Sequence, residues 1–139
     1  MLLLLHSGKN ESNLKYLQGN PNQSKDLERA EIIDAKVSVI MTDKFSNQPH
    51  AIDHKNILLA LSIKKYFLQN KKYDTILYIQ LIKPENKIHY QNGLQSMSIN
   101  GKLGEDQVII VEEIKMNLLS KSCIIPGIIP FITNLVNSS

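Results

Sequence analysis

The segment that most restricts the fold is Thr75–Ile82, an almost uninterrupted apolar run between two helix-forming stretches. Its β-branched and aromatic side chains favour a strand, because they pack well on a pleated surface. A strand that is apolar at successive positions has to be buried on both faces. Strands of this kind separated by helices predict an α/β fold with a parallel sheet covered on both faces.

The same alternation continues along the rest of the chain. Short apolar runs at Leu2–Leu5 and Leu14–Leu17 predict two strands, and Ser24 is expected to cap a first helix. Lys36–Met41 is a β-branched strand, and Pro49 suits the first turn of a long helix. The remaining expected elements are a short helix over Pro84–Tyr90, a loop over Gln91–Gly104, a strand over Val108–Val111, and helices over Glu112–Cys123 and Ile128–Val136. The order βαβαβαβ, followed by two helices, predicts a Rossmann-like, doubly wound fold.

Composition narrows the possible partners. The 139 residues are 42% hydrophobic with a net charge of +3, which fits one domain with a core. Arg29 is the only arginine and 6% of residues are aromatic, so we expect no nucleic-acid partner. The lysines of the long helix, Lys55, Lys64 and Lys65, are expected on its solvent side.

The single cysteine, Cys123, excludes an internal disulfide and fits a reducing compartment. Its apolar neighbours Ile124 and Ile125 favour a buried packing role. No stretch approaches the roughly 18 consecutive apolar residues of a membrane helix, so we expect no span within this chain.

An ordered series of short motifs runs almost from end to end. The motifs are Gln18-Gly19, Asp26-Leu27-Glu28-Arg29-Ala30, Thr42-Asp43-Lys44, Pro49 with Asp53 and Asn56, Ile79-Gln80-Leu81, Glu85-Asn86-Lys87, Gly104-Glu105-Asp106-Gln107-Val108-Ile109, Glu113-Ile114-Lys115, Ser122-Cys123 and Pro126-Gly127. Their order and spacing resemble the first lobe of the RCK domain (regulator of potassium conductance) of Slo-type, large-conductance calcium-activated potassium channels, over about Leu2 to Val136.

The resemblance implies that the chain begins at the second strand of such a lobe. The first βα unit would then be missing, which would expose one edge and one face of the sheet. Residues 1–111 would form a partial Rossmann-like core, and residues 112–139 the helix-turn-helix crossover. The crossover would pack against other RCK lobes or channel subunits in a homo-oligomer on the cytoplasmic side of a membrane, the fragment alone being soluble.

The resemblance also places a partial calcium site. Asp53 matches by position an aspartate that supplies a calcium ligand in the family, and Gln48 adds a side-chain oxygen. Calcium takes about six to eight oxygen ligands, so these two residues form at most part of a Ca²⁺ site.

The same stretch offers a transition-metal alternative. His50 and His54 share a helix face beside Asp53, with Asp43 nearby in the sequence. We favour a solvated helix start for these residues.

Enzymatic chemistry is poorly supported. Only Gly8 follows the first strand, whereas a dinucleotide fingerprint requires three spaced glycines. Asp106, Glu112 and Glu113 form an acidic group whose expected role is salt-bridged or solvated rather than catalytic.

The C-terminal helix supplies more apolar surface than one small sheet edge can cover. Its expected interface residues are Ile128, Phe131, Ile132 and Leu135. An ordinary terminal helix on its own core is the alternative.

Taken with the resemblance, these features predict a ligand-sensing, calcium-type gating domain of a potassium channel, which takes part in potassium ion transport. The alternatives are a truncated Rossmann NAD-dependent oxidoreductase and a free-standing RCK-like regulatory or assembly module.

Overall fold

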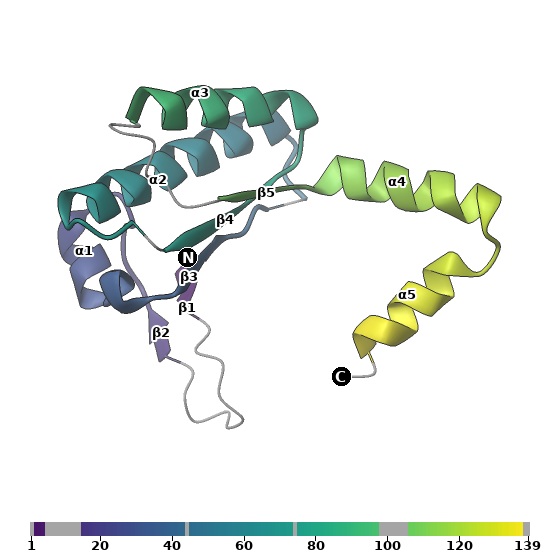
Figure 1. Cartoon of the computed structure of the whole chain (residues 1–139), viewed down its shortest axis with the longest axis horizontal. Coiled ribbons are helices and arrows are strands. Elements are labelled where there is room, and N and C mark those ends of the chain that lie inside the picture. Colours follow the sequence, from purple (N-terminus) through teal and green to yellow (C-terminus); the bar gives the residue numbers. More distant parts are fainter. Residues whose placement is uncertain (1, 5–14, 44, 74, 98–105, 138–139) are drawn as a thin grey trace.

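The computed structural model describes residues 2–4, 15–43, 45–73, 75–97 and 106–137. Its centre is a parallel sheet with the strand order β3-β4-β5 (Figure 1). The strands are β3 (Val37–Ile40), β4 (Ile76–Leu81) and β5 (Gln107–Ile110). In the register, Ile40 lies opposite Ile79, and Ile79 lies opposite Val108. The α/β, Rossmann-like class predicted from the sequence is confirmed.

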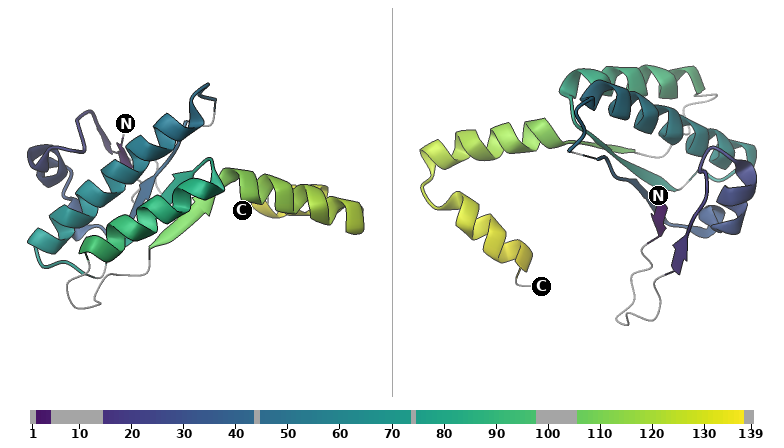
Figure 2. Two further views of the ribbon diagram at one scale, coloured as in Figure 1. Left: turned by 90° about the horizontal axis from the view of Figure 1, so that it is seen from above. Right: turned by 180° about the vertical axis from the view of Figure 1, so that it is seen from behind.

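Two long helices lie side by side over one face of this sheet (Figures 1 and 2). They are α2 (Pro49–Gln69), which begins at Pro49 as predicted, and α3 (Lys87–Met97), which follows the 3-10 turn η3 (Pro84–Asn86). The helix α3 continues to Met97, so the loop expected from Gln91 is wrong over this stretch. The monotonic strand order explains the arrangement, because right-handed crossovers between successive parallel neighbours place their helices on the same face.

A short helix, α1 (Ser24–Arg29), and the 3-10 turn η2 (Ile32–Asp34) precede β3. Ser24 is the first helical residue, and the N-cap is Gln23 rather than Ser24. The apolar core lies between the sheet and the helices. Its buried members are Leu27, Ile32, Ile40, Ile57, Ala60, Ile63, Phe67, Leu77, Ile79, Leu81 and Tyr90.

The opposite face of the sheet is open in the described part of the chain. On β3, Ser38 and Ile40 are buried, whereas Val39 is 48% exposed; Ile109 on β5 is 39% exposed. Helices on both faces, which the apolar strands predicted, are therefore not found among the described residues.

The first two strands form a separate antiparallel pair. They are β1 (Leu2–Leu4) and β2 (Lys15–Leu17), with Leu3 opposite Tyr16. Only ten residues connect them, and a parallel crossover needs a dozen or more, so the short connection accounts for the antiparallel pairing. β1 comes near β3 but is not its hydrogen-bonded neighbour.

The last two helices extend away from the sheet as an arm (Figures 1 and 2). They are α4 (Val111–Ile124) and α5 (Ile128–Asn137), joined by a turn in which Gly127 has a φ of 90°. Neither helix contains a buried residue among those described. No helix in the described ranges combines the length and hydropathy that crossing a bilayer requires.

Candidate functional site

Asp53, the predicted sensor residue, lies in the second turn of α2 and is completely buried. Its Oδ1 accepts a hydrogen bond from the N–H of Ile82 at 2.8 Å. Its Oδ2 accepts from the N–H of Lys83 at 2.9 Å and from Nδ2 of Asn86 at 2.8 Å. All three donors belong to the turn between β4 and α3. The carboxylate therefore fixes this turn to the start of α2, at the carboxyl end of β4.

The same turn is tied to the start of α4. Nζ of Lys83 lies 2.7 Å from Oε1 of Glu112, and the N–H of Glu112 donates to the carbonyl of Ile82 at 3.3 Å. The hydrogen bond to Glu112 raises the pKa of Lys83 above its usual value. We call Asp53, Ile82, Lys83, Asn86 and Glu112 the Asp53 junction; it connects α2, the turn after β4 and the arm.

The donors around Asp53 bear on the predicted calcium site. Each N–H directs a partial positive charge at the carboxylate and occupies lone pairs that a cation would need. Gln48, at the N-cap of α2, is exposed, and its side chain makes no capping hydrogen bond. The described arrangement does not fit an ion held by Asp53 and Gln48, and the partial calcium site stays an untested prediction.

The two histidines of the alternative metal site contact different residues. Nε2 of His50 lies 3.8 Å from Oε1 of Glu85, and its Nδ1 lies 3.4 Å from Nδ2 of Asn86. The ring of His54 packs edge-on against His89, with centroids 5.6 Å apart. In the described part of the chain, no group of three or more His, Cys, Asp or Glu residues is arranged to hold a metal ion.

A second buried polar cluster lies at the amino end of the sheet; the sequence predicted a salt-bridged or solvated Asp106 but neither its partner nor its burial. Nζ of Lys64 is 2.5 Å from Oδ1 of Asp106, and the two side chains are only 3% and 2% exposed. The hydroxyl of Tyr90 donates to Oδ2 of Asp106 at 2.8 Å, and the N–H of Leu77 donates to Oδ1 at 3.2 Å. Burial, reinforced by the charge of Asp106, raises the pKa of Tyr90. The solvent-side position predicted for Lys64 is wrong, because its ammonium group pairs with a carboxylate that lies far away in the sequence.

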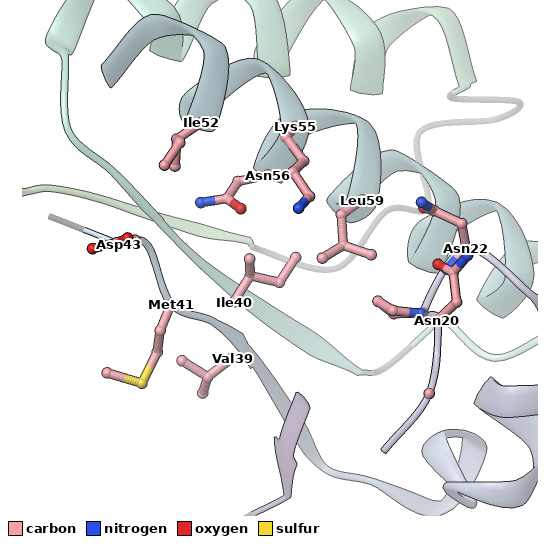
Figure 3. Close-up of a pocket in the computed structure, with 12 residues that line it drawn as sticks. Asn20, Asn22, Val39, Ile40, Met41, Asp43, Ile52, Lys55, Asn56 and Leu59 are labelled. Carbon is pink, nitrogen blue, oxygen red and sulfur yellow. The ribbon is translucent and has the colours of Figure 1, made fainter. Parts of the chain in front are cut away.

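A cavity of about 490 Å³ lies between α2 and the outer edge of β3 (Figure 3). The loop of Gly19–Asn22 borders it on one side, and Asp43 on another. Asn56 of α2 also lines it and is only 8% exposed, and its Nδ2 has no hydrogen-bond partner among the described residues. The remaining lining residues are Val39, Ile40, Met41, Ile52, Lys55 and Leu59.

The predicted interface residues lie on the arm. Phe131 is 63% exposed and Leu135 is 58% exposed, while Ile128 and Ile132 are half-buried. Cys123 on α4 is exposed, so the buried packing expected for it is wrong within this chain.

Comparison with known proteins assigns the family. The family model described as "Calcium-activated potassium channel slowpoke-like RCK domain" matches residues 4–111. The chain belongs to the slowpoke-like RCK domain family. A second family model, "Calcium-activated BK potassium channel alpha subunit", matches residues 106–139, which include both helices of the arm.

Individual relatives agree with this assignment. The calcium-activated potassium channel slo-1 of Caenorhabditis elegans is 32% identical over 122 residues, covering 88% of this chain and 10% of the relative. Potassium channel subfamily T member 1 of Mus musculus is 32% identical over 124 residues, covering 89% of this chain and 9% of the relative. The structure of the human SLO3 gating ring matches with a TM-score of 0.64 and 28% identity, covering 86% of this RCK chain and 20% of that one. The chain thus spans about a tenth of the length of these curated relatives.

Proposed function

We propose that this RCK chain is part of a ligand-sensing gating domain on the cytoplasmic side of a potassium channel. The family match and the similarity to a gating ring support this role. The family is a channel regulatory domain, which favours a non-enzymatic role over a truncated NAD-dependent oxidoreductase. Potassium transport would belong to the assembled channel, and this chain would bias its opening.

The observation that carries the proposal is the Asp53 junction. It joins the predicted sensor residue to the first turn of the arm through Lys83 and Glu112. A ligand that prefers one arrangement of the α2 start would thereby favour one orientation of the arm. Such a difference in affinity between two arrangements is what couples a ligand to a distant pore. Calcium is the ligand that the family resemblance suggests.

The arm supplies the proposed connection to partners. Its exposed apolar side chains, Phe131 and Leu135 among them, would pack on another RCK lobe or channel subunit, giving a homo-oligomer. The division into a core of residues 1–111 and crossover helices of residues 112–139 follows the same logic.

A chimeric channel tests the gating role. The matching segment of Caenorhabditis elegans slo-1 is replaced by this chain, and potassium currents are recorded from excised patches over a range of calcium concentrations. We expect channels whose opening still depends on an intact Asp53 junction, so that Glu112→Gln changes the voltage of half-opening and Glu113→Gln does not. Glu113 is the matched control because it is exposed in the same helical turn.

Surface labelling of the chimera makes a negative result informative. Chimeric channels that reach the surface in normal amounts, but open identically with and without the Glu112→Gln substitution, would contradict coupling through the junction.

A further inference from the structure

The carboxylate of Asp53 is enclosed by donors that belong to the chain itself. Its side chain is 0% exposed, and its oxygens accept from the N–H groups of Ile82 and Lys83 and from Nδ2 of Asn86. A carboxylate offers about four lone-pair positions, so these contacts leave about one. Because the remaining position has no access to solvent, binding a cation requires the turn after β4 to open.

Opening this turn would leave buried donors without an acceptor. N–H groups cannot ligate a cation, so each donor that loses Asp53 would become an unpaired polar group, which is costly in the interior. Two of the donors are main-chain groups of Ile82 and Lys83, whose positions are set by the backbone of the turn. A cation and the hydrogen bonds of the Asp53 junction therefore compete for the same oxygens.

The neighbouring carboxylates do not supply the rest of a calcium site. Oε1 of Glu112 lies 2.7 Å from Nζ of Lys83, and Oε1 of Glu85 lies 3.8 Å from Nε2 of His50. The hydrogen bond to Glu112 raises the pKa of Lys83, and the charge of Asp53 adds to this effect, so an ammonium group already compensates both carboxylates. Calcium needs about six to eight oxygen ligands, usually with several carboxylates among them. The charge balance of the junction is complete without such an ion.

We infer that Asp53 is a positioning residue, which couples α2 to the arm and binds no divalent cation. Its carboxylate holds the turn after β4, and Lys83 in that turn holds Glu112 at the start of α4. The calcium ion that the family resemblance suggests would then bind elsewhere in the assembled channel, and the Asp53 junction would transmit its effect. The inference rests on the proposed function, and it assigns Asp53 to the coupling path instead of the ligand site.

Recordings in calcium-free solution separate the two roles. A lost ligand changes nothing when no calcium is present, whereas a lost positioning contact changes opening at any calcium concentration. In the slo-1 chimera with a chelator present, we therefore expect Asp53→Asn to shift the voltage of half-opening. Asn86→Leu, which removes a donor but keeps the carboxylate, should shift it in the same direction. Asp53→Asn channels that match the unsubstituted chimera with chelator, and differ from it only when calcium is added, would overturn the inference.

Isothermal titration calorimetry on the full chain tests ion binding directly. The titrant is calcium chloride up to about 1 mM, the weak end of protein calcium sites. We expect no saturable heat that depends on Asp53. Saturable heat that Asp53→Asn abolishes and Glu113→Gln retains would contradict the inference. If Asp53→Asn does not fold by circular dichroism, Asn86→Leu decides, because tighter binding by this variant than by wild type would identify a carboxylate freed for an ion.

The same recordings distinguish this inference from the proposed function. Channels that reach the surface, but in which neither Asp53→Asn nor Glu112→Gln changes opening at any calcium concentration, would contradict both. A shift caused by Glu112→Gln, together with an Asp53→Asn effect that requires calcium, would overturn only the positioning role of Asp53 and leave the gating role standing.

Discussion

At the scale of single residues, Asp53 shows how one carboxylate can organise a turn. Its two oxygens accept three hydrogen bonds from a segment that begins 29 residues later, and its side chain has no contact with solvent. The three donors are main-chain and amide N–H groups, and together they stabilise the negative charge of the buried carboxylate. The junction is therefore a structural feature of the fold.

Replacing Asp53 by asparagine should destabilise the protein in calcium-free buffer. The amide has nearly the same shape, but it presents its own donors to N–H groups that need an acceptor. We expect Asp53→Asn to lower the free energy of unfolding by roughly 2–4 kcal/mol in urea titrations with a chelator present. Glu113→Gln is the control, because it removes an exposed carboxylate from α4. It should change the free energy of unfolding by less than about 0.5 kcal/mol. A loss that appears only when calcium is added would instead identify Asp53 as primarily an ion ligand.

The buried pair of Lys64 and Asp106 predicts that substitutions of the neighbouring residues Lys64 and Lys65 have very different effects on stability. Lys64→Met leaves the carboxylate of Asp106 buried without its cation, which should cost about 3–5 kcal/mol of unfolding free energy. Lys65→Met removes an exposed charge one residue away and should have little effect. Adding Asp106→Asn to Lys64→Met should recover part of the loss, because the uncompensated charge is then gone. Equal effects of the two lysine substitutions in urea titrations would contradict the buried pair.

Tyr90 makes stability depend on pH in the alkaline range. Its raised pKa means that the folded state holds the phenolic proton more tightly than the unfolded chain, in which the pKa is about 10. The contribution of this protonated hydroxyl to stability is fully present below about pH 10 and is lost as the pH rises further. Tyr90→Phe should lower the free energy of unfolding by about 1 kcal/mol at neutral pH. Above about pH 10, the free energy of unfolding of this variant should fall less steeply than that of the wild type. Tyr73→Phe, at an exposed position, should follow the wild-type curve in urea titrations across this range.

The sequence indicated Asp53 and Asp106 as notable residues but could not identify the partners of either carboxylate. Asp53 was singled out by its place in a motif, but its donors are identified only when the turn after β4 is folded back onto α2. Lys64 follows Ile63 in a helix rich in lysine, so pattern alone placed it in solvent. Its burial depends on Asp106, a long-range partner that no local periodicity contains.

At the scale of elements, the packing of α3 on α2 depends on Gly93. A Cβ at this position would lie 2.7 Å from Cδ1 and 3.0 Å from Cδ2 of Leu61. Gly93→Val should therefore cost about 1–3 kcal/mol by separating the helices, whereas Gly93→Ala gains up to ~1 kcal/mol of helix propensity against a smaller clash. Leu61→Ala should relieve most of the additional cost of valine when the two changes are combined. A valine variant as stable as wild type in thermal unfolding would show that the helices separate freely.

Helices and strands could be predicted from the sequence where they depend on neighbouring residues. Pro49 marked the start of α2, and the apolar run of Thr75–Ile82 marked β4, because both depend on nearby residues. The pairing of β1 with β2 and the single helical layer were not predicted, since they depend on how long the connections are and on which strands are present to be covered. The length of α3 was underestimated because Gly93 and the polar residues around it are typical of a loop, whereas the structure has them in a helix that packs against α2 near Leu61.

At the scale of the whole molecule, the chain has a compact α/β body and a projecting arm (Figure 1). Every buried residue of the core belongs to the body or its edges, and none belongs to α4 or α5. An apolar helix pair with so little support from its own body gains stability by contact with another surface. The junction at Lys83 and Glu112 fixes the first turn of the arm to the body.

The exposed face of α5 therefore predicts association through the arm. We expect Phe131→Asp to lower the oligomer order measured by light scattering, because it places a charge in the apolar contact. The same change should leave the unfolding free energy of the separated chain within about 0.5 kcal/mol, since Phe131 is 63% exposed and supports no core. Asn134→Asp adds the same charge at an exposed polar position of α5 and should leave the oligomer intact. A wild type that stays monomeric as its concentration is raised, or equal dissociation by both variants, would contradict assembly through the apolar face of α5.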